Sequence, residues 1–212
     1  MANYCFLCVT NTKTIYPHWA RRRYDPDRQI VSCDVYCIPL LWFALFRPGD
    51  MVRKTFTLDG RKVAVQAPLT TVKKAIRQLD EAVPYFNKLF RREGPLDEYA
   101  AFLRQALEGI GYRHITIDLD EIAIMYETRK EFYGDFRTAL EYIDVEYVMT
   151  QVAKSHFKRL AGLSKLKKFP PARFILDNLK AVHDNDDEIY TRLLGCGGQS
   201  SVYGGRHAPW EP

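Results

Sequence analysis

Three carboxylates stand close together in the run Asp-Leu-Asp-Glu, at residues 118–121. If a strand continues through them, Asp118 and Asp120 share a face, because side chains alternate along a strand. Carboxylates at a strand end can bind Mg²⁺ or act as general acid and base. One hypothesis is therefore a metal-dependent hydrolase or nucleotide enzyme that uses Asp118, Asp120 and Glu121. We favour the structural interpretation, a helix N-cap with a negatively charged first turn.

Cysteines form a second candidate set, in the spacings Cys5-x-x-Cys8 and Cys33-x-x-x-Cys37. Four thiolates could hold zinc in tetrahedral geometry. Residues three apart on a strand point to opposite faces, however, so Cys5 and Cys8 cannot converge without a turn. We therefore expect buried structural thiols, with no metal site and no cofactor. The odd total of five cysteines, behind an N-terminus that does not resemble a secretory signal, predicts reduced thiols in a cytoplasmic protein.

The third candidate set is a basic triplet between two aromatic residues. Arg21, Arg22 and Arg23 lie between Trp19 and Tyr24. Cations interleaved with aromatics suit a nucleic-acid-binding protein that uses the Arg21–Arg23 loop. No familiar RNA- or DNA-binding sequence pattern accompanies them, so we do not expect nucleic acid to be the partner. Arg, Trp and Tyr are also the common anchors of protein interfaces.

Composition and charge limit the classes of protein to consider. The chain has 212 residues, 47% of them hydrophobic and 27% charged, which is ordinary for a globular protein with a sizeable core. The net charge is +5, yet residues 101–150 carry five Lys and Arg against ten Asp and Glu. Such asymmetry suits a nucleic acid or an acidic protein as partner, but we favour a solvated mixed surface as its explanation. No stretch qualifies as a transmembrane helix, so we expect no membrane partner.

The elements that must position these residues are organised around the apolar stretch from Ile30 to Phe46. We interpret Ile30–Tyr36 as a strand that turns at Pro39 into a short buried helix over Leu40–Phe46. Further strands are predicted near residues 4–10, 52–58, 62–66 and 114–119, with a hairpin turn at Asp59-Gly60.

Helical periodicity marks the remaining segments. The spacing predicts helices over Leu69–Phe90, with Thr70 or Thr71 as the cap and a kink or break at Pro84, and over Leu96–Ile110. Helical spacing returns in two pieces between residues 132 and 160, and again near residues 171–182. The fold class is therefore α+β, a small mixed or antiparallel sheet packed with amphipathic helices.

Three segments follow from this pattern. Residues 1–128 form an α/β core domain, and residues 129–183 form a helical part packed on it. Residues 184–212 form an acidic and then Gly-rich tail, which we expect to be extended or partly disordered.

Four stretches occur in an order that resembles a family of bacterial immunity-like proteins. They are MANYCFLCVTNT, DVYCIPLLWFALFRPGD, LDEAVPYFNKLF and HITIDLDEIAIM, and the resemblance covers about residues 1–126. The family begins Met-Ala-Asn with a short strand and carries an aromatic-Asp-x-Pro-Leu segment soon after. Here Cys37 separates Tyr36 from Ile38, a departure from that segment.

The resemblance implies a cytoplasmic protein that binds and neutralises an antibacterial toxin encoded next to it, by occluding the toxin's active site. It supplies no functional residues, so the contact residues are predicted from their types. They are Trp19, Arg21, Arg22, Arg23, Tyr24, Asp118, Asp120 and Glu121.

Overall fold

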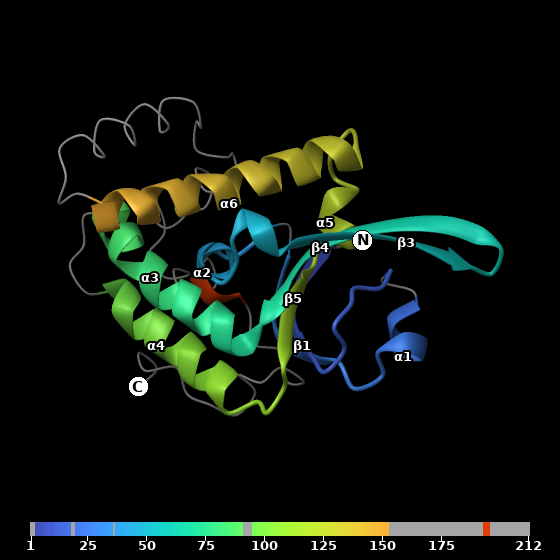
Figure 1. The fold of residues 1–212 in the computed structure, drawn as a ribbon, viewed down its shortest axis with the longest axis horizontal. Coiled ribbons are helices and arrows are strands. Elements are labelled where there is room, and N and C mark those ends of the chain that lie inside the picture. Colours follow the sequence, from blue (N-terminus) through green and yellow to red (C-terminus); the bar gives the residue numbers. More distant parts are fainter. Residues whose placement is uncertain (1–2, 18–19, 36, 91–94, 153–192, 196–212) are drawn as a thin grey trace.

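A computed structural model describes residues 3–17, 20–35, 37–90, 95–152 and 193–195 of the chain. Its sheet has five strands in the order β2-β1-β5-β4-β3, and every neighbouring pair runs antiparallel (Figure 1). The strands are β1 (Tyr4–Thr10), β2 (Gln29–Val35), β3 (Met51–Leu58), β4 (Arg61–Thr71) and β5 (His114–Asp118). The predicted α+β class is confirmed, with an antiparallel sheet.

Helices of very different lengths accompany the sheet. They are α1 (Arg21–Tyr24), α2 (Leu40–Ala44), the 3₁₀ turn η2 (Pro48–Asp50), α3 (Val72–Phe90), α4 (Pro95–Glu108), α5 (Asp120–Ala123) and α6 (Arg129–Val152). Among the described residues, none of these helices combines the length and the apolar composition needed to cross a bilayer.

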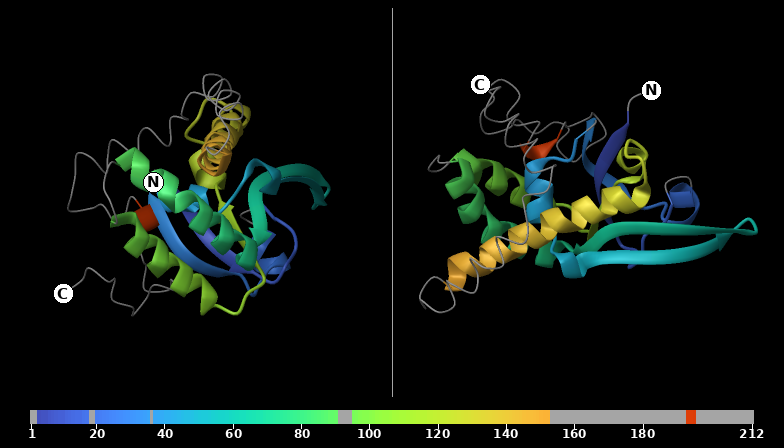
Figure 2. Two further views of the ribbon diagram at one scale, coloured as in Figure 1. Left: turned by 60° about the vertical axis from the view of Figure 1, so that its left-hand side comes forward. Right: turned by 90° about the horizontal axis from the view of Figure 1, so that it is seen from above.

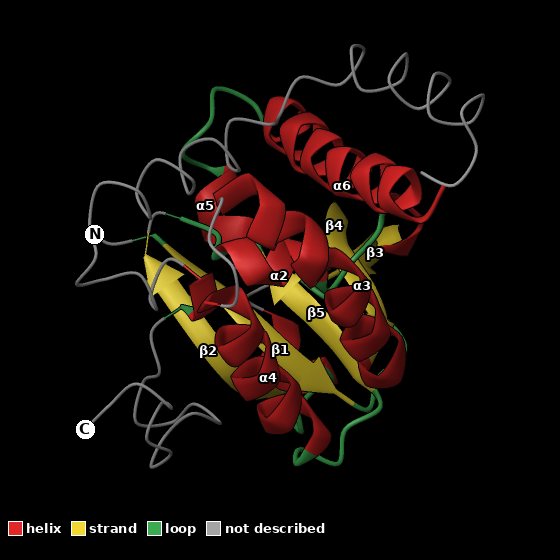
Figure 3. Cartoon of the chain, turned by 90° about the vertical axis from the view of Figure 1, so that its left-hand side faces the viewer, coloured by secondary structure: helices red, strands yellow, loops and turns green. Residues whose placement is uncertain are grey.

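The main core lies between one face of the sheet and the helices α2, α3 and α4 (Figure 3). Alternation along the strands turns Cys5, Leu7 and Val9 of β1 and Ile115 and Ile117 of β5 toward these helices. All five side chains are fully buried. This pattern leaves the alternate residues of β1 and β5 on the opposite face, where the candidate site lies.

The apolar stretch that follows β2 fills the centre of this core, as predicted. Every residue from Leu40 to Phe46 has no exposed surface. Pro39 precedes α2 in an extended conformation, and the Trp42 amide donates to the Pro39 carbonyl. Arg47 then closes the segment by donating to the carbonyls of Ala44, Phe46 and Gln78.

The hairpin β3–β4 forms around the predicted turn. Asp59 and Gly60 both have positive φ, 50° and 75°, which is the requirement of a tight two-residue hairpin turn. The second strand is longer than predicted, because β4 continues through Leu69 to Thr71 by pairing with β5. The helix α3 therefore starts at Val72, and the Thr71 hydroxyl caps it by accepting the Lys74 amide.

Two predicted helix interruptions are absent from the described chain. Pro84 lies inside the single helix α3, where its side chain is exposed and buried residues on both sides hold the helix to the core. Helix α6 is likewise continuous from Arg129 to Val152, and its apolar face, Phe132, Phe136 and Leu140, joins the main core.

A short segment near the C-terminus also belongs to the core. Leu193 and Leu194 are buried, and the Leu194 carbonyl accepts hydrogen bonds from the Ser32 hydroxyl at 3.0 Å and the Trp42 indole at 2.9 Å. These residues fall within the segment 184–212, which was expected to be an extended tail. The predicted helix near residues 171–182, the acidic run and the Gly-rich stretch lie outside the described residues.

Candidate functional site

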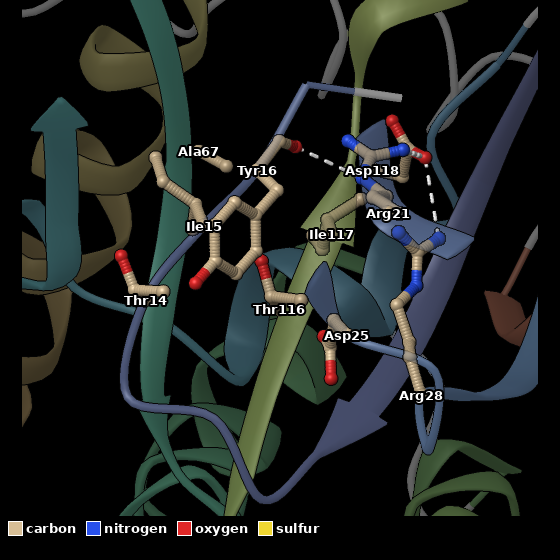
Figure 4. A pocket seen from close by; sticks show the side chains of 10 residues that line it. All are labelled: Thr14, Ile15, Tyr16, Arg21, Asp25, Arg28, Ala67, Thr116, Ile117 and Asp118. Carbon is tan, nitrogen blue, oxygen red and sulfur yellow. Dashed lines mark hydrogen bonds and ion pairs between the residues drawn. The ribbon is translucent and has the colours of Figure 1, made fainter. Parts of the chain in front are cut away.

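The sheet face opposite α2–α4 carries the predicted site. Cys8 of β1 lies opposite Thr116 of β5, and Asp118 follows at the end of β5. Residues 11–17 and 20–28, which include α1, cross over this face (Figure 4). The structure therefore brings Arg21, from the basic triplet, next to the carboxylates at the end of β5 and the start of α5, far away in the sequence.

Arginines from the covering segment pair with these carboxylates. Arg21 forms an ion pair with Asp118, and the Arg28 Nη2 atom lies 3.2 Å from the Asp118 Oδ2 atom (Figure 4). The second Arg21 nitrogen, Nη2, lies 3.5 Å from Asp120 Oδ2, and Arg129 Nη1 lies 3.5 Å from Asp120 Oδ1. Two carboxylates thus face three guanidinium groups.

The residues of these ion pairs are largely buried, so each charged group relies on its partner for stability. Asp118 is only 3% exposed, and the side chains of Arg21 and Arg28 are each 12% exposed. Burial, and then the neighbouring Arg28 cation, lower the pKa of Arg21 to about 10, so its guanidinium is still charged at neutral pH. A buried charge without its partner is strongly destabilising, so the main effect of this cluster is to hold the covering segment on the sheet.

The short helix α5 confirms the acidic first turn expected for the Asp-Leu-Asp-Glu run, but its N-cap position is Leu119, which makes no side-chain cap hydrogen bond. Asp120 and Glu121 occupy its first turn, and Asp118 Oδ1 accepts the Asp120 amide at 3.3 Å. Glu121 Oε2 accepts the Tyr4 amide at 2.9 Å, which ties α5 to the start of β1. Each of the three predicted carboxylates therefore has a partner in the chain.

Little room remains beside the cluster. The cavity lined by Arg21, Arg28 and Asp118 holds about 20 Å³, enough for roughly one water molecule. A larger depression of about 690 Å³ lies between the start of α3 and the end of α4, with His114 and Glu108 in its wall. Asp118, Asp120 and Glu121 do not line that depression.

Asp25 anchors the covering segment, residues 20–28, at a second place, beside the end of β1. Asp25 Oδ1 accepts hydrogen bonds from the hydroxyls of Thr10 at 2.7 Å and Thr12 at 3.1 Å. The Arg21 Nε atom also donates to the Tyr16 carbonyl at 3.0 Å. The segment is thus held at both ends of α1.

The outer side of the segment presents a ladder of stacked side chains. The guanidinium carbon of Arg23 lies 5.4 Å from the centre of the Tyr24 ring. Tyr24 stacks on Tyr16 with ring centres 5.4 Å apart, and Tyr16 packs on Phe56 of β3 at 5.3 Å. Tyr24 is 39% exposed, and Arg23 is exposed as well. We name Arg23, Tyr24, Tyr16 and Phe56 the aromatic ladder.

The predicted contact residues therefore separate into two groups. Arg21, Asp118, Asp120 and Glu121 are engaged within the molecule, whereas Arg23 and Tyr24 face solvent. Trp19 and the side chain of Arg22 lie outside the described part of the chain.

The cysteines lie on both faces of the sheet. Cys5 belongs to the main core and Cys8 lies beneath Arg21 and Arg28, so the predicted divergence of these two thiols is confirmed. Burial raises the pKa of both thiols, well above the ordinary value for Cys5. Within the described ranges, no three His, Cys, Asp or Glu side chains are grouped so that they could hold a metal ion.

Arg28, Tyr16 and Phe56 are the site residues that sequence reasoning missed. Arg28 and Asp118 are 90 positions apart, so no local pattern connects them. A weaker signal was available for Tyr16, which precedes Pro17 in a segment already rich in aromatic and basic residues.

Comparison with known proteins found no family model, no characterised protein and no solved structure that matches this chain.

Proposed function

We propose that this protein is a cytoplasmic binding module of the immunity type, which neutralises a bacterial toxin by occluding its active site. The sequence resemblance described above motivates the choice of partner. The structural observation that supports a binding role is the aromatic ladder, in which solvent-facing Arg23 and Tyr24 rest on a rigid base. Arg and Tyr are common hot-spot residues of protein interfaces.

Preorganisation gives this ladder its value for binding. Tyr24 does not have to be ordered on association, because Tyr16 and Phe56 already hold its ring. The buried pairs of Arg21 with Asp118 and Asp120 fix the backbone immediately before it. Side chains ordered in advance lose less conformational entropy when a partner binds.

The enzyme hypothesis has less support from the geometry. Its candidate residues, Asp118, Asp120 and Glu121, accept hydrogen bonds from the chain or pair with its cations instead of converging on an open cavity. The nucleic-acid hypothesis based on the Arg21–Arg23 loop is weakened in the same way, because Arg21 is paired with carboxylates.

The decisive experiment is co-purification with the product of the neighbouring gene, followed by calorimetric titration of the complex. Replacing Arg23 and Tyr24 by alanine is expected to weaken binding by about 2 kcal/mol or more, roughly thirtyfold, because hot-spot residues contribute at this level. The matched control replaces Arg137 and Met125, which are 57% and 47% exposed and lie outside the ladder. It should leave the affinity unchanged.

The two parts of the proposal can fail separately. If the neighbour is not a toxin and no complex forms, the immunity function is wrong. If a complex forms but Arg23→Ala with Tyr24→Ala binds as tightly as the control, the function stands and the assigned surface is wrong.

A further inference from the structure

The hairpin β3–β4 projects from the body of the protein as a two-stranded arm (Figures 1 and 2). Within the described chain, β4 pairs with β5 only at Leu69, Thr70 and Thr71, whereas residues 61–68 pair with β3 alone. At the rise of an extended strand, these residues make a ribbon about 25 Å long. We name residues 51–68 the arm.

The two faces of the arm differ in chemistry. Directly paired residues share a face, so Phe56 and Val63 lie together with Val65 on one side. This side packs on Ile15 in a small apolar cluster. The other face is polar and open to solvent, with Arg53, Thr55, Thr57 and Lys62 all exposed. One face of the arm therefore packs against the rest of the protein, and the other is open for a binding partner.

Positive charge accumulates along this ribbon. Arg53, Lys54, Arg61 and Lys62 are exposed, and Asp59 at the turn is the single carboxylate between them. Lys54 donates a hydrogen bond to the neutral Thr14 hydroxyl. In the described part of the chain, none of these cations lies beside a carboxylate, although Arg77, Arg104 and Arg137 on the helices each do.

The open face lacks what a protein partner generally requires. Protein interfaces are enriched in aromatic residues and depleted of Lys, whereas this face offers Arg, Lys, Thr and Gln with alanine as its one apolar exposed residue. Protein–DNA interfaces are more polar and far more positive. The major groove of B-form DNA is about 12 Å wide and admits a two-stranded ribbon, while the corresponding groove of duplex RNA is narrow and deep.

We propose that the arm is a binding site for double-stranded DNA, with its polar face in the major groove and Arg53 and Lys62 against the flanking phosphates. This function goes beyond toxin neutralisation and uses a surface other than exposed Arg23 and Tyr24. Arg53 and Lys62 lie on the open face, whereas Lys54 and Arg61 lie on the face that packs against the body. The two open-face cations are therefore the ones placed to reach the DNA.

Fluorescence anisotropy with a labelled duplex about two helical turns long tests this site at several salt concentrations. For the two phosphate contacts of Arg53 and Lys62, the logarithm of the affinity should fall with the logarithm of salt with a slope of about −2. The arm variant replaces Arg53, Lys54, Arg61 and Lys62 by glutamine, and it should bind at least about tenfold more weakly with a slope near zero.

A matched control removes the same amount of charge elsewhere. It replaces Lys73, Arg77, Lys130 and Arg137, which are exposed on α3 and α6, by glutamine. This variant should keep most of the affinity and the slope of the unmodified protein. A smaller change at the turn, Arg61→Gln with Lys62→Gln, should halve the slope, and it covers the case in which the larger arm variant does not fold.

Three results would overturn the proposal. The first is an unmodified protein that does not bind the duplex even at low salt. The second is equal weakening in the arm and control variants, which would show an effect of net charge. The third is tighter, arm-dependent binding of poly-glutamate than of the duplex, which would indicate an acidic protein as the partner.

Discussion

At the residue scale, Gly195 is the described glycine with the least room for a side chain. Its φ is +83°, and a Cβ atom placed there would lie 2.8 Å from the Cys33 carbonyl oxygen, 2.7 Å from the Ser32 hydroxyl and 2.9 Å from the Trp42 ring. Any side chain therefore meets both an unfavourable backbone conformation and a steric overlap. The close contact exists because the neighbouring Leu194 carbonyl accepts from Ser32 and Trp42.

Replacing this glycine by alanine should lower the free energy of unfolding by about 2–4 kcal/mol, the combined cost of positive φ and overpacking. Urea denaturation followed by far-UV circular dichroism measures the change. Gly49→Ala is the control, because no atom lies within 4 Å of the added Cβ and its φ is not positive. Equal losses in the two variants would contradict the described packing of residues 193–195.

At the scale of elements, the attachment of residues 20–28 to the sheet depends on Asp118. This carboxylate is nearly fully buried between Arg21 and Arg28, which belong to the covering segment, whereas Asp118 belongs to β5. Neutralising it leaves two partly buried cations without their shared counter-charge. The segment that carries the aromatic ladder should then detach before the rest of the fold is lost.

The substitution Asp118→Asn is expected to cost about 3–5 kcal/mol of stability, the usual cost of removing one partner of a buried pair. Trypsin should also cleave faster at Arg21, Arg23 and Arg28. The control is Asp80→Asn, which breaks the pair of Arg104 and Asp80 on the surface, where the side chains are 39% and 43% exposed. Its cost should stay below about 1 kcal/mol. Unchanged proteolysis in Asp118→Asn would show that other contacts hold the segment.

Local patterns in the sequence predicted most of the elements, because each of them is encoded by near neighbours. The β-rich run of β1, the Asp59-Gly60 turn and the cap at Thr71 are all visible within a few residues. The extension of β4 to Thr71 was missed because it depends on pairing with β5, more than 40 residues later. Tertiary pairing overrode the helical spacing that begins at Leu69.

The candidate site was only half predictable for the same reason. The residue types at Arg21–Tyr24 and at Asp118–Glu121 were recognised separately, but the sequence contained no sign that Arg21 would be paired with Asp118. That contact removes both residues from the surface and leaves Arg23 and Tyr24 as the exposed pair. Burial of charge depends on the topology of the sheet, which single-sequence patterns do not specify.

At the scale of the whole molecule, the buried thiols make stability depend on pH. Burial raises the pKa of Cys5 and Cys8 in the folded state, whereas an unfolded thiol ionises near pH 8.5. Above that value the unfolded chain releases protons that the folded chain retains. The free energy of unfolding therefore has its full value below about pH 8. It should fall as the pH rises toward about 10, by up to about 1.4 kcal/mol per pH unit for each thiol.

Urea denaturation in reducing buffer across this range measures the fall. The variant Cys5→Ala with Cys8→Ala should be less stable at neutral pH, since it leaves cavities, but its stability should decline less with pH. Cys33→Ala is the control, because it removes a thiol while keeping both fully buried ones, and its decline should match that of the unmodified protein. A decline that persists in the double variant would assign the effect to other groups.

The hydrogen bond between Ser32 and Leu194 also has a consequence for biosynthesis. The two residues are separated by 162 positions, so the ribosome makes the donor long before the acceptor. Until residues 193–195 have been made, neither the Ser32 hydroxyl nor the Trp42 indole can donate to the Leu194 carbonyl. This part of the core is therefore completed only after most of the chain has been synthesised.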